Sequence, residues 1–465
     1  MRGARGLTPD LSGGQMDLLA QIPLIGPTLA VVAPFILVLA IVVFVHEFGH
    51  YIVGRWCGIG ADVFSVGFGK ELYGWTDRRG TRWRIAALPL GGYVKFSGDA
   101  DASSASADPQ ALARMTDAER ARSFHHAALG RRALTVLAGP VANFILSIVI
   151  FALMALGQGR PLDAPVIGAI SDDANPEFAQ ALRPGDRISA VDGAPVADFA
   201  ALQAALQASD GAPVAVTLAG ESGARTVEVI FRAPARVDGV SAGGAAEAAG
   251  VKPGDVIVAI DGAPISGFAE LQRRTAASAG APMTLSIRRG DALLALSLTP
   301  QVTQTTDPAT GAAVSRPMLG IQKQSSEILP VVEPVGPLSA LGFGVERTWM
   351  VVALSLSGIA EVVTGAQDAK DVLGGPIRIA EISGEAAASG VATFVGLIAV
   401  LSASIGLINL FPVPVLDGGH LMFYAIEAVR GRPLRERWQE IGNGIGLALV
   451  LSLMIFATFN DLARL

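Results

Sequence analysis

Four long apolar runs dominate the hydrophobic pattern of the chain, two near its beginning and two near its end. They cover residues 29–45, 134–156, 391–411 and 441–459, and the first continues with few polar interruptions to Trp56. A helix needs about 20 mostly apolar residues to cross the hydrocarbon core of a bilayer. The pattern therefore predicts a polytopic α-helical membrane protein with four transmembrane helices.

A fifth apolar run, at 349–359, is short. Glu346, Arg347 and Glu361 bracket about eleven apolar residues, well below the ~20 that a span requires. We expect residues 335–365 to form an amphipathic helix that lies at the membrane surface or packs against the protein.

Arginines near the ends of the spans predict the orientation, because cytoplasmic loops are enriched in basic residues. They flank the loop 57–132 between the first two spans, and four more crowd the short loop 421–439 between the last two. We therefore expect both loops to be cytoplasmic. Residues 158–390 and both termini would then lie on the opposite side.

The polar insert between the second and third spans contains an internal repeat. Residues 182–203 (LRPGDRISAVDGAPVADFAALQ) match residues 251–272 (VKPGDVIVAIDGAPISGFAELQ) at a constant offset. Each copy predicts a strand, a tight Asp-Gly turn, a second strand and a helix. The repeat therefore predicts two tandem α+β domains, at 163–235 and 236–305. Both resemble PDZ domains, which bind an extended peptide at a sheet edge, although the pair could also serve as a steric plug.

Composition narrows the classes of function. Hydrophobic residues make up 51% of the 465 residues, charged residues only 16%, and the net charge is −6. Ordinary soluble chains carry roughly 25% charge, and a nucleic-acid-binding chain would show a basic surface, so we expect no nucleic-acid partner. The single cysteine excludes an internal disulfide and a zinc site built of cysteines.

The strongest chemical signal is the sequence His46-Glu47-Phe48-Gly49-His50 at the end of the first span. Histidines four residues apart project from one face of a helix and can share a zinc ion, and the intervening glutamate acts as a general base. Three ionisable residues inside a span are costly and point to a functional site. We therefore expect His46 and His50 as metal ligands and Glu47 as the catalytic base.

A catalytic zinc site needs a third protein ligand. His125 and His126 lie in a charged loop stretch, and His420 begins the segment after the third span. The better candidate is Asp417, because the prolines of the preceding FPVPVL sequence break the helix at membrane depth. Broken helices are tolerated there only where they are buried in protein or line a cavity.

The HEFGH motif together with residues 409–419 (NLFPVPVLDGG) resembles the site-two protease family of intramembrane zinc metalloproteases. Two PDZ-like domains between the second and third spans are similar to its bacterial regulator-of-sigma-E branch. The resemblance implies one Zn²⁺ per chain, with His46, His50 and Asp417 as ligands and Glu47 as the base. It also implies that Asn409 holds the substrate backbone or the oxyanion.

The resemblance further implies a membrane-associated β-hairpin loop after the first span, which includes Gly67, Gly69 and the segment 83–96. Alternation around Ile85 agrees with a hairpin strand. A substrate helix must unwind before it can be cut, and we expect the strand edge at Ile85 to pair with the unwound chain.

The function that the resemblance implies is regulated intramembrane proteolysis of single-span membrane proteins. The implied substrates are anti-sigma factors already trimmed by another protease, and remnant signal peptides. The implied location is the bacterial inner membrane, with the PDZ-like domains in the periplasm. Residues 1–28 would form an N-terminal extension, 29–157 the first two spans and 391–465 the last two. The alternatives are a different membrane metalloprotease, a PDZ scaffold with a vestigial site, and a transporter, since broken helices also mark transport sites.

Overall fold

The structure is a computed structural model of the whole chain. It describes residues 25–99, 114–171, 175–209, 211–220, 223–241, 244–306, 313–323, 327–365, 367, 369 and 374–464. The chain divides into two compact units, one made of Met1–Gly157 with Gly336–Leu465 and the other of Gln158–Val335. Most of the expected extension 1–28 lies outside the described residues.

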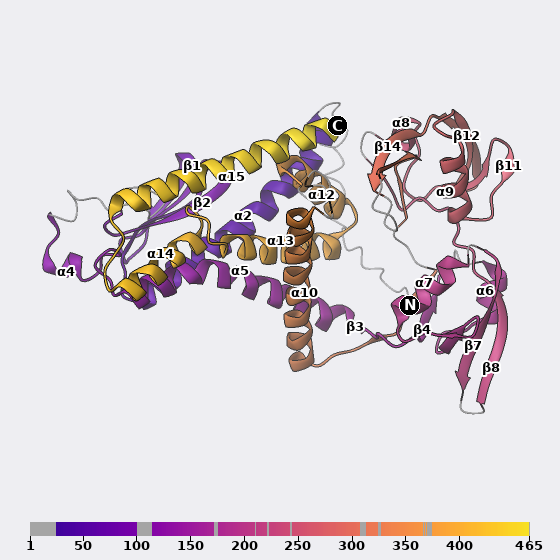
Figure 1. The fold of residues 1–465 in the computed structure, drawn as a ribbon, viewed down its shortest axis with the longest axis horizontal. Helices are drawn as coiled ribbons and strands as arrows, with labels where there is room; N and C mark the ends of the chain where they lie inside the picture. Colours follow the sequence, from indigo (N-terminus) through magenta and orange to yellow (C-terminus); the bar gives the residue numbers. More distant parts are fainter. Residues whose placement is uncertain are drawn as a thin grey trace, which may run out of the picture. The chain divides into compact units, whose positions relative to one another are not determined.

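The first unit is a helical bundle. Four of its helices run roughly along one direction in Figure 1: α2 (Ile25–Trp56), α5 (Leu129–Gln158), α13 (Val391–Asn409) and α15 (Glu436–Arg464). These four and α10 (Pro337–Thr364) are the described helices that are long and apolar enough to cross a membrane. The apolar helices agree with the predicted polytopic membrane protein.

The core of the bundle lies where α2, α5 and α13 meet. Val38 and Val42 of α2 and Ile398 of α13 are buried there, and Leu146 and Ile150 of α5 pack against them. Of these three helices, α2 carries the HEFGH motif, and α5 and α13 pack beside it.

Helix α10 lies within the expected range 335–365 but differs from the expectation in its character. Its 28 residues are long and apolar enough to qualify as a span by length and composition. In Figure 1 it runs across the direction of the other long helices. It crosses α5 closely, because Gly344 lies against the Ile148 carbonyl, and the Ser147 and Thr348 hydroxyls are 3.0 Å apart.

The predicted break after the third apolar run is present. Helix α13 ends at Asn409, an irregular segment follows, and α14 (Asp417–Arg430) begins at the predicted ligand. Gly418 packs so tightly on this segment that a Cβ there would lie 2.3 Å from the Leu410 carbonyl oxygen. The glycines therefore let the chain fold back on itself and present Asp417 at a helix N-terminus.

Two shorter helices complete this unit, α4 (Asp117–Arg120) and α12 (Pro376–Ala388). Asp461 near the end of α15 accepts the backbone N–H groups of Gly375 and Arg378, each at 3.0 Å. It thereby satisfies the N-terminus of α12, which has no side-chain cap of its own. α12 in turn packs on α2, so Asp461 joins the last helix to the helix that carries the HEFGH motif.

The expected hairpin is formed by two long strands, β1 (Ala61–Thr76) and β2 (Arg82–Phe96), that bend and pair twice. Val66 pairs with Ile85 on one side and with Gly92 on the other, and Ile85 also pairs with Tyr73. The segment around Ile85 is therefore internal to the sheet. The segment 92–96 pairs on one side only and forms an edge.

Asp77 in the hairpin turn attaches this sheet to α2. Its carboxylate accepts the backbone N–H groups of Arg79 and Thr81, the Tyr51 hydroxyl at 3.2 Å and the Trp83 indole N–H at 3.1 Å. Since Tyr51 directly follows the HEFGH motif, the turn holds the sheet against the end of α2 that carries the motif.

The second unit contains two copies of one α+β arrangement. The first has β4 (Ile167–Ile170), α6 (Pro176–Ala181), β5 (Arg187–Val191), β6 (Ala194–Pro195), α7 (Phe199–Ala208), β7 (Pro213–Gly220) and β8 (Gly223–Ile230). The second has β9 (Gly239–Val240), α8 (Ala245–Ala248), β10 (Val256–Ile260), β11 (Ala263–Pro264), α9 (Phe268–Ala277), β12 (Met283–Arg289) and β13 (Ala292–Leu298). The sheets have matching strand orders, β6-β5-β7-β8 and β11-β10-β12-β13.

The repeat extends to backbone detail. Asp192 and Asp261 adopt φ values of 48° and 50° at equivalent turns. Their carboxylates accept the equivalent backbone N–H groups of Ala215 and Thr284, each at 2.7 Å. The duplication predicted from the sequence therefore corresponds to two structurally equivalent copies within the second unit.

The two copies are nested, not simply consecutive. A hairpin of β14 (Gln301–Thr306) and β15 (Ala313–Met318) leads to β16 (Ile321–Gln322), which pairs with β9 of the second copy. Next, β17 (Ile328–Pro330) returns to pair with β4, and Ile328 is fully buried in the core of the first copy. The connecting strands β3 (Arg160–Pro161) and β18 (Val332–Glu333) pair at the two ends of the unit. The second copy is thus inserted into the first, and both extend beyond the ranges 163–235 and 236–305.

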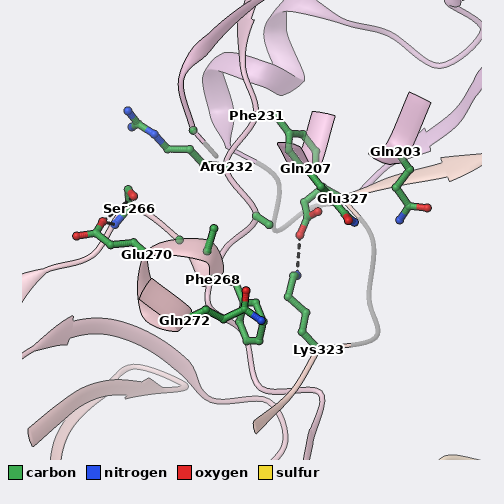
Figure 2. A pocket seen from close by; sticks show the side chains of 14 residues that line it. Gln203, Gln207, Phe231, Arg232, Ser266, Phe268, Glu270, Gln272, Lys323 and Glu327 are labelled. Carbon is green, nitrogen blue, oxygen red and sulfur yellow. Dashed lines mark hydrogen bonds and ion pairs between the residues drawn. The ribbon is translucent and has the colours of Figure 1, made fainter. Parts of the chain in front are cut away.

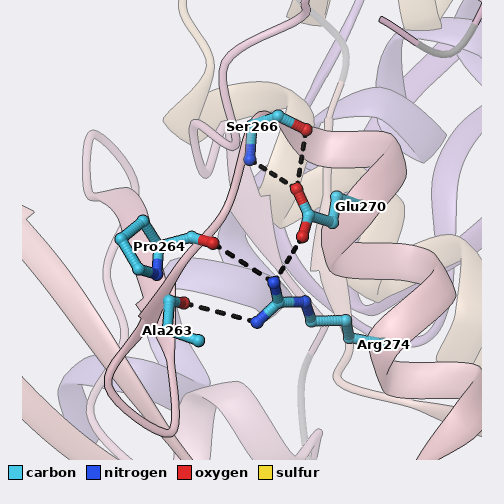
Figure 3. A network of polar contacts seen from close by, with 5 residues as sticks. All are labelled: Ala263, Pro264, Ser266, Glu270 and Arg274. Carbon is cyan, nitrogen blue, oxygen red and sulfur yellow. Dashed lines mark hydrogen bonds and ion pairs between the residues drawn. The ribbon is translucent and has the colours of Figure 1, made fainter.

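The copies differ at the start of their main helix. Asp198 caps α7 with its side chain, whereas the equivalent residue before α9 is Gly267. Figure 3 shows the replacement: Glu270 accepts hydrogen bonds from the backbone and hydroxyl of Ser266 and from Arg274. The bonds from Ser266 and then from Arg274 lower the pKa of Glu270 to about 2. Arg274 also reaches two carbonyls of β11 and so holds that strand to the helix.

Candidate metal centre and active site

The two histidines of the HEFGH motif lie together on one face of α2. His46 and His50 are each only 9% exposed, and their ring centroids are 4.8 Å apart, as expected for positions i and i+4 of a helix. Their Nε2 atoms are 3.2 Å apart. The sequence motif thus places two nitrogen donors side by side.

Asp417 supplies a third donor from α14. Its Oδ2 atom lies 3.0 Å from Nε2 of His46 and 3.4 Å from Nε2 of His50. This oxygen is buried and accepts no hydrogen bond of good geometry among the described residues. These three residues are the one group of possible metal ligands found in the described part of the chain.

The three donor atoms fit a zinc ion. Tetrahedral bonds of about 2.0–2.1 Å to nitrogen and oxygen place neighbouring ligand atoms about 3.3 Å apart, and the three separations here are 3.0, 3.2 and 3.4 Å. Two imidazoles and one carboxylate leave a fourth position open, which is the arrangement of catalytic zinc sites. A buried carboxylate oxygen facing two imidazole nitrogens is costly without a cation to satisfy all three.

One face of α5 supports both histidines and was missed in the sequence. Thr135, Gly139 and Asn143 follow at four-residue spacing. The Thr135 carbonyl lies 2.9 Å from Nδ1 of His50, and the Asn143 amide lies 3.2 Å from Nδ1 of His46. Gly139 between them leaves room for the His50 ring. Small and polar residues at this spacing, in an otherwise apolar span, were the signal that could have found them.

Glu47 lies beside the donors and against the edge of the hairpin sheet. A Cβ built on Gly92 would lie 3.2 Å from Cγ of Glu47, and the Val94 backbone hydrogen-bonds the Glu47 carboxyl group. The edge segment 92–96 therefore lies directly against Glu47.

A cavity of about 320 Å³ opens onto these groups. It is lined by His46, Glu47, His50, Phe68, Gly92, Tyr93, Val94, Phe96, Phe124, Val136, Asn409, Val415, Asp417, His420 and Tyr424. Asn409 thus lies where the resemblance implies. Gly67 and Gly69 do not line the cavity but flank Phe68, which does, and Ile85 is absent from the lining. His420 lines the cavity without joining the three donors.

The sequence as a whole matches the model of peptidase family M50 over residues 34–453. The chain belongs to that family.

Two relatives illustrate how far the similarity reaches. A protein of Agrobacterium fabrum that carries the provisional name zinc metalloprotease is 41% identical over 93% of this chain and 96% of its own length. The regulator of sigma-E protease of Salmonella typhimurium is 36% identical over 93% of this chain and 98% of its own length. The similarity therefore covers both the bundle and the repeated insert, and this chain is a multi-pass membrane zinc metalloprotease of the site-two protease type.

Proposed function

We propose that this M50 peptidase carries out regulated intramembrane proteolysis, cutting the transmembrane helix of single-span membrane proteins. The observation that carries the proposal is the set of three donor atoms at tetrahedral spacing beside Glu47. Two of the donors and Glu47 lie in α2, a helix long enough to span a bilayer, and Asp417 reaches them from the start of α14. The Salmonella relative is named as a regulator of sigma-E protease, and this name supports a substrate that acts on a sigma factor. We propose an anti-sigma-factor-like protein that another protease has trimmed beforehand, as the sequence resemblance implies. Remnant signal peptides are a second substrate class of the same chemistry.

The residues of the site have three different roles in the proposed reaction. His46, His50 and Asp417 would hold the zinc ion, which supplies a Lewis acid to polarise a peptide carbonyl and acidify water. Glu47 accepts a proton from the attacking water and can return it to the leaving amine. Asn409 at the end of α13 presents an amide that can hold the substrate carbonyl or the developing oxyanion.

We place four spans in the inner membrane and leave α10 outside them. His46 and His50 lie in the carboxyl-terminal part of α2, and Asn409, the last residue of α13, lines the same cavity, so we infer that both helices cross in the same direction. One extra crossing by α10 alone would reverse α13, and α12, with 13 residues, is too short to restore it. In this arrangement the loops 57–132 and 421–439 are cytoplasmic and the second unit is periplasmic.

The substrate must exchange its helical hydrogen bonds for new ones, because lipid offers none. The edge 92–96 has a strand partner on one side only and borders Glu47. It can supply the new hydrogen bonds by strand addition once the Val94 N–H exchanges its bond to Glu47 for one to the substrate. This edge replaces Ile85 as the pairing site, because Ile85 has strand partners on both sides.

Two variants test the active site and the edge together. Glu47→Gln removes the base but no ligand, and Val94→Pro removes one edge N–H. We expect both to retain one zinc per chain in elemental analysis and to lose cleavage of a reconstituted single-span reporter. Cleavage at the wild-type rate by Glu47→Gln would refute the mechanism, whereas cleavage by Val94→Pro alone would refute only the strand addition.

We further propose that the second unit binds extended peptides as PDZ domains do. A groove of about 350 Å³ lies between α9 and the segment 316–321, beside Arg316. Figure 2 shows a second pocket of about 420 Å³, where Gln207 of α7 and Gln272 of α9 approach the Lys323–Glu327 ion pair. Peptides with a free C-terminus should bind more tightly than their amidated forms. Equal affinity for the two forms would exclude recognition of a terminal carboxylate.

A further inference from the structure

Four arginines from separate segments surround one cavity of about 540 Å³ in the first unit. Arg55 is in the last turn of α2, Arg79 in the turn between β1 and β2, Arg114 just before α4 and Arg122 just after it. None of these residues touches the metal site or lines its cavity. The cluster therefore has no part in the mechanism derived above.

Backbone hydrogen bonds build the frame of this cavity. The Gly60 N–H donates to the Arg122 carbonyl, and the Ser97 N–H donates to the Gly60 carbonyl, each at 2.8 Å. These bonds fix the segment after α4 to the start of β1 and the end of β2. The arginines therefore converge on the cavity from a defined scaffold.

The charges around the cavity do not balance. None of the four arginines has an ion-pair partner among the residues that the structure describes. Two acids also line the cavity, but the Asp62 carboxylate accepts the Ser97 hydroxyl at 2.6 Å, and the Glu119 carboxylate accepts the backbone N–H and hydroxyl of Thr116 at 2.8 Å. Four positive and two negative groups leave an excess of two positive charges.

A role in membrane orientation explains why basic residues lie near the end of a span, but not why four of them line one cavity. The bias towards arginine in cytoplasmic loops depends on how many charges lie near the span ends. Arg78 and Arg120 serve that purpose equally well, yet neither lines the cavity, although each lies within two residues of an arginine that does. Four guanidinium groups that converge on one cavity create a positive local potential that favours a bound anion.

We propose that this cavity binds a phosphate group, since guanidinium groups recognise phosphate oxygens through paired hydrogen bonds. The headgroup of an anionic phospholipid is the favoured source. Arg55 lies in the last turn of a membrane-spanning helix, and the next residue, Trp56, is 76% exposed. Exposed tryptophan at a span end is typical of the headgroup region. A bound headgroup would join the end of α2, the hairpin turn and the segment around α4.

The test compares two double variants of the full-length protein that lose the same net charge. Arg79→Gln with Arg122→Gln removes two cavity arginines, and Arg78→Gln with Arg120→Gln removes two neighbours outside the cavity. Each protein, in a neutral detergent, is titrated separately with short-chain phosphatidylglycerol, short-chain phosphatidylcholine and inorganic phosphate. Zinc content and the melting temperature without additive confirm that both variants fold.

We expect phosphatidylglycerol to bind the wild type, and the cavity variant to bind it roughly thirtyfold more weakly, about 2 kcal/mol for two arginines. The neighbour variant should stay within about twofold of the wild type. If inorganic phosphate shows the same loss in the cavity variant, the phosphate site stands and its source is soluble. Equal affinities of the two double variants for every probe, or no binding by the wild type, would overturn the proposal.

Discussion

Gly139 makes the metal site possible by the absence of a side chain, and Gly139→Ala should remove the metal from an otherwise intact protein. The residue faces the His50 ring from α5. A Cβ added there would lie 2.2 Å from Nε2 and 2.4 Å from Cε1 of that ring. Contacts below 3.0 Å essentially never occur for a real Cβ. The clash falls on the atom that would bind the metal.

The required displacement can be worked out from these distances. Moving Nε2 from 2.2 Å to 3.0 Å takes at least 0.8 Å, the difference of the two values. Zinc–ligand distances tolerate only about 0.2 Å. The ring is also held by its bond to the Thr135 carbonyl, so it cannot retreat without losing a second interaction. We expect at least the tenfold to hundredfold loss of zinc affinity that follows from disturbing a ligand's support.

The assay is chelator competition on the purified protein, followed by elemental analysis. Gly130→Ala and Gly157→Ala are matched controls, because both lie on α5 and a Cβ there meets nothing within 4 Å. All three variants should show the same helical circular dichroism. Zinc affinity in Gly139→Ala equal to that of the controls would refute the close contact and the site geometry derived from it.

Two further predictions concern other parts of the molecule. An imidazole that offers Nε2 to a cation carries its proton on Nδ1. The Asn143 Nδ2 atom faces Nδ1 of His46, and its Oδ1 atom is buried without a partner in the described part of the chain, so the amide turns its oxygen to Nδ1 when that nitrogen carries the proton. Asn143→Leu should therefore weaken zinc binding about tenfold to hundredfold, and Asn143→Asp, which keeps an acceptor, should restore most of it; equal affinities in chelator competition would contradict this role. In the second unit, two hydrogen bonds from Arg289 hold the pKa of Asp255 below its usual value. The contribution of the ionised Asp255 to the free energy of unfolding is fully present above its unfolded pKa of about 3.9. That contribution is lost as the pH falls through the lower pKa of Asp255 in the folded protein. At neutral pH, Asp255→Asn should lower the free energy of unfolding by about 2 kcal/mol. The equivalent Asp186 accepts only a backbone hydrogen bond, so Asp186→Asn should lower it by about 1 kcal/mol. Equal increases in the amide exchange rates of the two variants would contradict this difference.

The ligand residues could be predicted because their signals are local. Histidines at i and i+4 lie on one helix face wherever that helix packs, and prolines before Asp417 break a helix in any context. The roles of Gly139 and Asn143 could not be assigned in this way. Their spacing with Thr135 marks a small and polar face of an apolar span, but what that face supports depends on which helix lies opposite.

The strand pairing in the hairpin also depends on contacts between distant parts of the chain, which the sequence pattern does not reveal. Alternation identified the strand around Ile85, but the sequence does not state that β1 bends at Gly67 and Gly69 and pairs on both sides of that strand. The edge at 92–96 follows from this non-local pairing. The bounds of α10 were expected closely, but its qualification as a span was not, because Glu346 and Arg347 interrupt the apolar run without ending the helix.

The nesting of the two repeated domains has a consequence for how the protein is made. The core of the first domain is completed by Ile328, about 160 residues after Ile167 begins it. At roughly 5–20 residues per second, the ribosome needs about 8 to 32 s to synthesise that interval. During this time the first domain lacks its closing strand, while the inserted domain emerges complete. The inserted domain can therefore fold before the outer one, whose core stays open until the last strand has been synthesised.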